Sequence, residues 1–68
     1  MYKPDKVDKE IYVIDSKGNK LCRTDFVLDT ENDVATFQKE CTEYPAGTTG
    51  YVASTKKVLM LNCQGVFV

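Results

Sequence analysis

The chain has 68 residues, of which 43% are hydrophobic, and its 9 basic and 10 acidic side chains give a formal net charge of −1. A chain of this size forms one domain and buries only about 60% of the surface that its unfolded form exposes, so a disulfide, a metal or a partner chain usually supplements the core. The balanced charge excludes nucleic-acid binding through a basic face, and the absence of histidine removes the commonest metal ligand and general base.

Three cysteines, Cys22, Cys41 and Cys63, are spread along the chain. An odd number without a close pair does not form a disulfide framework, and no apolar leader follows Met1 that would direct the chain to an oxidising compartment. The C-x-x-C spacing of zinc sites is also missing. We therefore interpret the three as small buried apolar residues, and expect association with another chain to supplement the core.

Residues 1–9 alternate in charge almost residue by residue and contain Pro4. The segment has neither the period of a helix nor that of a strand, which predicts a flexible N-terminal arm. In an assembly such an arm can lie on a neighbouring subunit. The domain itself is then expected to comprise residues 10–68.

Residues 10–15 are rich in β-branched and aromatic side chains and predict a strand. A cluster of turn-forming residues follows at 16–19. Residues 20–28 then predict the return strand of a hairpin, with a slip near Asp25 that indicates a bulge or the end of the strand.

Residues 31–42 predict a short amphipathic helix that lies across the sheet. Thr30 followed by Asp33 fits a capping box, and negative charge in the first turn favours the helix dipole. Pro45 ends any helix before it. One narrow apolar stripe recurs at helical spacing: Val34, Phe37 and Cys41.

The same segment contains a pattern that resembles a calcium-binding loop. Counted from Asp29, three acidic residues fall at positions 3, 5 and 12 of such a loop: Glu31, Asp33 and Glu40. Position 6 is Val34, where the sharp turn of the loop requires glycine. Helix capping is the better interpretation, and we predict no catalytic residue, cofactor or metal in this chain.

The last third of the chain predicts a three-stranded antiparallel meander, with strands at 48–53, 58–62 and 66–68. Both faces of the middle strand are apolar, which indicates a central strand covered on both sides. The helix can cover one side. A second subunit is expected to cover the other side and the apolar final strand.

The chain is therefore predicted to be a mostly β, α+β domain with an N-terminal β-hairpin, one short helix and a C-terminal antiparallel meander. The expected interface consists of six apolar residues of the meander: Tyr51, Val58, Met60, Val66, Phe67 and Val68.

Part of the meander resembles a module of tailed bacteriophages that recurs in short virion proteins, including head fibre proteins, and at the ends of longer tail proteins. The stretches that carry the resemblance cover about 25 of the 68 residues: Pro45–Ala53, Ser54–Leu61 and Gln64–Val68. The module closes on Gly and Trp-Val, where this chain has Phe67 in place of Trp, and Leu59 or Met60 stands where an aromatic residue is frequent. The resemblance implies a structural role on a virus particle, in a symmetric oligomer (a trimer is favoured) bound to a capsid or tail protein.

Our main hypothesis is thus a non-enzymatic structural or decoration protein of a virion, made in the host cytoplasm, without nucleic-acid or membrane partners. The alternative is a small phage-encoded inhibitor of a host defence protein, in which the acidic segment 25–43 mimics nucleic-acid charge. A cysteine nucleophile is a third hypothesis. It lacks a base, and among the three cysteines only Cys22 has basic neighbours in sequence, Lys20 and Arg23.

Overall fold

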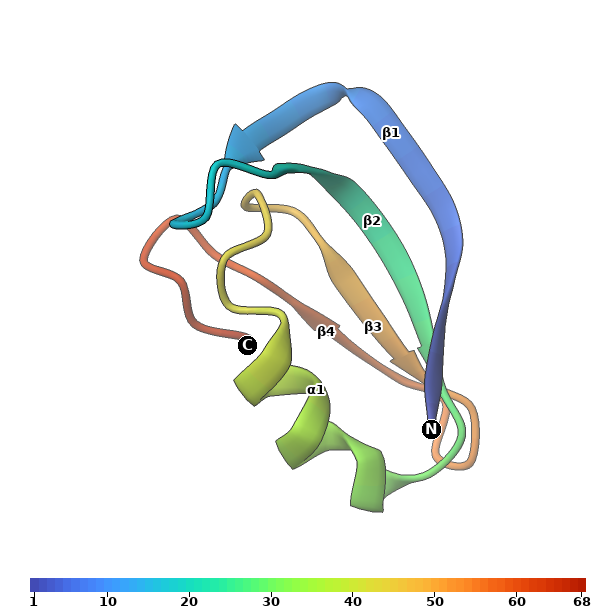
Figure 1. Ribbon diagram of the computed structural model, residues 1–68. Coiled ribbons are helices and arrows are strands. Elements are labelled where there is room, and N and C mark those ends of the chain that lie inside the picture. Colours follow the sequence, from blue (N-terminus) through green and yellow to red (C-terminus); the bar gives the residue numbers. More distant parts are fainter.

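In the computed structural model, which describes residues 1–68, a four-stranded sheet and one short helix form two layers (Figure 1). The strands lie in the order β1-β2-β3-β4; the two outer pairs are antiparallel, and β2 and β3 are parallel. The crossover between β2 and β3 contains a 3-10 turn and helix α1. The elements are β1 (Tyr2–Ile14), β2 (Lys20–Leu28), η1 (Glu31–Asp33), α1 (Val34–Glu40), β3 (Thr49–Val52) and β4 (Lys57–Met60).

The structure confirms a small, mostly β domain with an N-terminal hairpin and one short helix, and it confirms the meander only in part. β3 and β4 form the predicted hairpin, but the final strand is reduced to one antiparallel bridge between Leu61 and Phe67. Met60 and Val68 exchange two backbone hydrogen bonds of 3.0 Å beside this bridge. The parallel pairing of β2 with β3 was not predicted. It makes the sheet mixed, because the crossover through α1 returns the chain to the end where β2 began.

Residues 2–9 belong to β1, and the structure has no boundary at residue 10 between an arm and the domain. The pairing of β1 with β2 is irregular, with register shifts between Pro4 and Lys6 and between Asp8 and Tyr12. Such bulges bend a strand, and Figure 1 shows β1 bending about midway. Proline, lysine and bulges are typical of an edge strand, which explains how a segment without apolar alternation pairs in a sheet.

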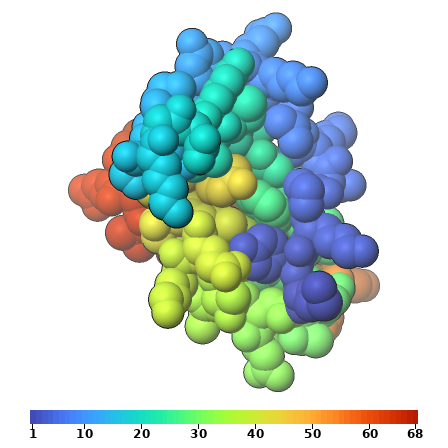
Figure 2. Space-filling view, in the orientation of Figure 1, coloured from blue at the N-terminus to red at the C-terminus, as the bar shows by residue number.

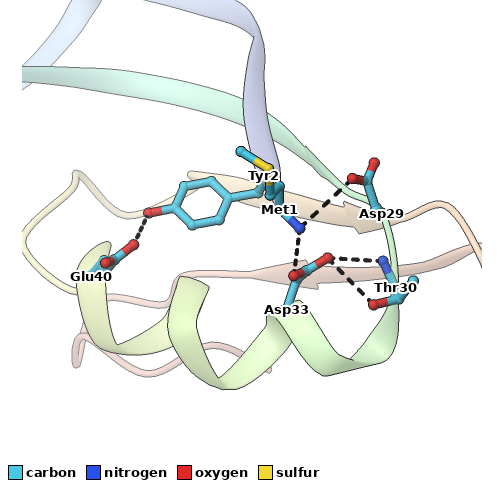
Figure 3. Close-up of polar contacts among 6 residues, drawn as sticks. All are labelled: Met1, Tyr2, Asp29, Thr30, Asp33 and Glu40. Atoms are coloured by element: carbon cyan, nitrogen blue, oxygen red, sulfur yellow. Dashed lines mark hydrogen bonds and ion pairs between the residues drawn. The ribbon is translucent and has the colours of Figure 1, made fainter.

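The start of β1 is held at the N-terminal end of the helical segment (Figure 3). The α-ammonium group of Met1 lies 2.5 Å from an Asp33 carboxylate oxygen and 3.7 Å from Asp29. The predicted capping box is present: the backbone N–H of Thr30 donates to Asp33 at 3.1 Å. The hydrogen bond to Asp33 raises the pKa of the Met1 amino group, and the same bond lowers the pKa of the Asp33 carboxyl.

Seven buried residues form the core between the helix and the sheet: Phe26, Leu28, Phe37, Cys41, Val52, Leu61 and Phe67. Phe37 is the only buried residue of α1, and its ring centroid lies 5.4 Å from that of Phe26 and 4.8 Å from that of Phe67. Gly50 lies beneath this ring. A Cβ at Gly50 would be 2.5 Å from the Phe37 ring and 3.1 Å from Leu28. The helix therefore reaches the sheet only because position 50 has no side chain.

We expect Gly50→Ala to lower the free energy of unfolding by about 1–3 kcal/mol, because the added methyl group overpacks the core. Urea denaturation of the purified chain measures this change. In the double variant Gly50→Ala/Phe37→Leu the smaller side chain makes room for the methyl group, so its loss should be less than the sum of the two single losses. Full additivity of the two substitutions would contradict the contact.

We expect the stabilising effect of Asp33 to depend on pH in two directions. The pKa of Asp33 is below its ordinary value of 3.8, so its contribution is present above that pH and is lost as the pH falls through the lowered pKa. The pKa of the Met1 amino group is above 8.0, so its contribution is complete below pH 8 and is lost as the pH rises through the raised pKa. The difference in Tm between the wild type and Asp33→Asn should therefore be largest between these limits.

Asp5→Asn is the matched control, because Asp5 is an exposed carboxylate of β1 with no hydrogen bond or ion pair of its own. Its Tm difference from the wild type should show no maximum in this pH range. A Tm difference for Asp33→Asn that is equally flat would contradict the ion pair with Met1.

Candidate interaction surface

The face of the sheet opposite α1 carries a continuous apolar surface. Directly paired residues of neighbouring strands lie on the same face of a sheet. Val27 pairs with Tyr51, and Tyr51 pairs with Val58 on β4. Met60 follows on the same face of β4 and pairs with Val68. We call this surface the open face and define it by six residues: Val27, Tyr51, Val58, Met60, Val66 and Val68.

Most of the open face is accessible to solvent. The exposed fraction rises from 37% for Tyr51 to 70% for Val68, and only Val27 is half-buried. The alternate residues of β3, Gly50 and Val52, are buried under the helix. We expected both faces of β4 to be covered. Only the face toward the helix is covered, and there Leu59 packs against the core.

Five of the six predicted interface residues lie together on the open face. The sixth, Phe67, does not: it is 9% exposed and packs against Phe37 in the core. Neighbouring residues of an extended segment point to opposite faces. Phe67 therefore points into the core, and Val66 and Val68 point away from it. The expected exposure of Phe67 was therefore wrong, and Val27 is an open-face residue that was not among the predicted ones.

Charged residues of both signs border the open face on the β1 side. Asp25 on β2 lies opposite Lys6, and Arg23 lies opposite Asp8 and 3.7 Å from the Asp25 carboxylate. A shallow depression follows this band and is lined by three basic and three acidic residues together with Val7: Lys6, Lys9, Arg23, Asp8, Glu10 and Asp25. Balanced charges of this kind favour no single class of charged ligand, but two copies of the band can complement each other.

A second exposed apolar surface lies at the far end of the β1–β2 hairpin. Tyr12–Ile14 of β1 pair with Lys20–Cys22 of β2, beyond the stretch of β2 that pairs with β3. We call residues 11–22 the distal ribbon. Its four consecutive apolar residues are 36–59% exposed: Ile11, Tyr12, Val13 and Ile14. These residues were expected in a strand but not on a surface, although four apolar residues in a row signal a strand with two apolar faces.

The acidic segment 25–43 makes several contacts within the chain. Asp25 accepts a hydrogen bond of 2.8 Å from Thr49, and Glu31 lies 3.8 Å from the ammonium group of Lys57. Asp29 and Asp33 face the Met1 ammonium group.

No group of three or more Cys, Asp or Glu side chains is arranged to hold a metal ion. No helix is long and apolar enough to cross a bilayer.

The three cysteines are free and differ in exposure: Cys41 is buried, Cys22 is half-buried and Cys63 is exposed. Cys63 thus differs from the expected small core residue. The Cys41 thiol donates to the Tyr2 hydroxyl at 3.7 Å, and burial raises its pKa. Burial also raises the pKa of Tyr2, whose hydroxyl donates to Glu40.

Comparison of the chain with protein-family models, with curated proteins and with solved structures gave no match. The two apolar surfaces and their charged borders are therefore the basis for the functional proposal.

We expect the three thiols of the folded chain to react with iodoacetamide in the order of their exposure. The thiolate is the reacting form, so the buried Cys41 with its raised pKa should react only on unfolding. Mass spectrometry of peptides after timed alkylation measures each rate. Cys63→Ser should remove the fastest phase, and alkylation of Cys41 at the rate of Cys63 would contradict the burial of Cys41.

Proposed function

We propose that this chain is a non-enzymatic structural protein that acts by self-association, and that the open face is its subunit interface. The observation that carries the proposal is the apolar character of this face on strands whose other face is buried. A sheet that is apolar on both faces is stable in water when a layer covers each of them. Helix α1 supplies one layer, and a second copy of the chain supplies the other.

The charges around the open face support a second copy as the occupant. Residues 44–68 contain no acidic residue, and their two lysines, Lys56 and Lys57, lie in and beside the β3–β4 turn at one end of the face. Two such faces meet without charged groups between them. The band of Arg23 and Asp25 carries both signs, so that it attracts the same band of another copy.

The role that we propose for the assembly is that of a virion structural or decoration protein, similar to a head fibre protein, bound to a capsid or tail protein as a symmetric homo-oligomer. The resemblance of the C-terminal stretches to the phage module supports this role. Co-sedimentation of the chain with purified particles of the encoding virus tests it. Particles that lack the chain would contradict it.

The inhibitor hypothesis requires the acidic segment to be free to mimic nucleic-acid charge. It is not favoured, because four of its acidic residues form ion pairs within the chain: Asp25, Asp29, Glu31 and Asp33.

We expect the wild-type chain to form oligomers, and Val58→Lys and Met60→Lys to reduce the assembly to monomers without loss of folding. Both side chains are about half exposed, so that a lysine there costs little in the isolated chain but buries a charge in the interface. Light scattering after size exclusion measures the mass, and thermal unfolding followed by circular dichroism measures the stability.

Thr36→Lys is the matched control, since Thr36 is exposed on the helix, away from the open face. It should leave the mass unchanged. A wild-type chain that remains at the monomer mass of 7.7 kDa at all accessible concentrations would contradict self-association.

A further inference from the structure

We infer that the outer edge of β1 is a second self-complementary contact, at which β1 strands of two copies pair antiparallel about a two-fold axis at Val7. This inference rests on the proposed self-association and adds a second kind of contact to it. The first contact joins two sheet faces, whereas this one joins two sheet edges. Pairing at β1 makes one continuous sheet of two four-stranded ones.

The strand β1 lies at the edge of the sheet and pairs with another strand on one side only. Figure 2 shows its blue residues along the upper and right-hand border of the molecule. Its register shifts lie on either side of residues 6–8, so these three residues form a regular stretch, and Val7 at its centre is 50% exposed. An exposed strand edge is a template for pairing with another strand.

The backbone of Val7 points out of this edge. Directly opposite residues of an antiparallel pair alternate between pairs that exchange hydrogen bonds and pairs that do not. Val7 lies opposite Thr24, and the N–H of Thr24 points away from β1, since it donates to the Thr48 hydroxyl at 3.4 Å. The N–H and C=O groups of Val7 therefore also point away from β2. Two copies related by a two-fold axis at Val7 can exchange hydrogen bonds between these groups.

The charges on the two sides of Val7 are opposite in sign. Lys6 and Asp8 are its nearest neighbours, and Asp5 and Lys9 follow them. A two-fold axis at Val7 places Lys6 opposite Asp8 of the second copy, and Asp5 opposite Lys9 of the second copy. Each of these pairs occurs twice, once on either side of the axis. None of the four side chains forms an ion pair within its own chain, so all are available to a second copy.

The alternation of charge continues into β2. Within one copy Lys6 lies opposite Asp25, and Asp8 lies opposite Arg23. Across the joined sheet, Asp25 and Lys6 of one copy are followed by Asp8 and Arg23 of the other, so the sign changes at every strand. Opposite charges on directly opposed residues stabilise neighbouring strands. The mixed band beside the open face is therefore complementary to the same band of a second copy.

Neighbouring registers of the two strands bring like charges together. Moving the axis by half a residue places Asp5 opposite Asp8, or Lys6 opposite Lys9. Moving it by a whole residue places Lys6 or Asp8 opposite itself. Like charges that lie directly opposite each other destabilise a pair of strands. The charges that protect an edge strand from indiscriminate pairing thus exclude these shifted registers and permit the register centred on Val7.

The edge contact acts together with the open face. Exposed ion pairs are individually weak, so a chain without its open face remains monomeric. Two copies joined at β1 present their open faces side by side on one sheet, and two such pairs can stack on these faces. Two different two-fold contacts of this kind close into an assembly of four chains.

Two charge reversals test the edge contact. In a pair of identical copies, Lys6→Asp and Asp8→Lys each place like charges opposite each other on both sides of the axis. Each variant alone should therefore assemble only through the open face, with twice the 7.7 kDa chain mass, whereas the wild type should have four times that mass. In an equimolar mixture the two variants carry opposite charges at these positions, so the mass of four chains should return. Light scattering after size exclusion measures each mass.

Lys17→Asp is the matched control, because it reverses the charge of an exposed lysine in the β1–β2 turn, and it should keep the wild-type mass. A wild-type chain that is monomeric overturns both the inference and the proposed function. A wild type of two or three chains overturns the inference alone. Single variants that keep the mass of four chains, or a mixture that stays at the mass of two, do the same. Lys6→Glu and Asp8→Arg replace any variant that circular dichroism shows to be unfolded.

Discussion

The packing of one aromatic ring on one glycine holds the two layers of this protein together. Phe37 is the only side chain that α1 buries completely, and it lies on Gly50 in the middle of β3. Tyr2, Phe26 and Phe67 surround the ring, with Tyr2 at a centroid distance of 5.3 Å in an edge-to-face arrangement. Strands from three parts of the chain thus meet at one residue of a seven-residue helix.

The small size of that helix determines what the rest of the surface looks like. Seven residues give a helix of about 10 Å, and four strands form a sheet about 15 Å wide. The single helix α1 covers one face of this sheet, and the opposite face has no second layer. The core therefore lies entirely between α1 and the sheet. The apolar residues that point the other way, such as Tyr51 and Met60, remain accessible because no other element of the chain reaches them.

Local patterns were sufficient to predict the hairpin, the helix and the two strands that follow it, because each has the apolar period of its element. They were not sufficient for residues 2–9, since an edge strand that needs only one neighbour carries no apolar alternation. The parallel contact of β2 with β3 has no local signal at all. For the surface, the sequence could not distinguish Phe67 from its neighbours Val66 and Val68, because all three are apolar and only the contact of Phe67 with Phe37 shows which face is buried.

The parallel pair also affects the order in which the fold can form. Both hairpins close over short turns, whereas the pairing of Asp25 with Thr49 closes a loop of more than twenty residues. The entropy of closing such a loop costs about 3 kcal/mol by the logarithmic dependence on loop length. Contacts of Phe37 with both Phe26 and Gly50 offset that cost, since they form on the crossover itself. The two hairpins are thus locally closed halves of the chain, and one aromatic residue between them joins the halves into a single cooperative unit.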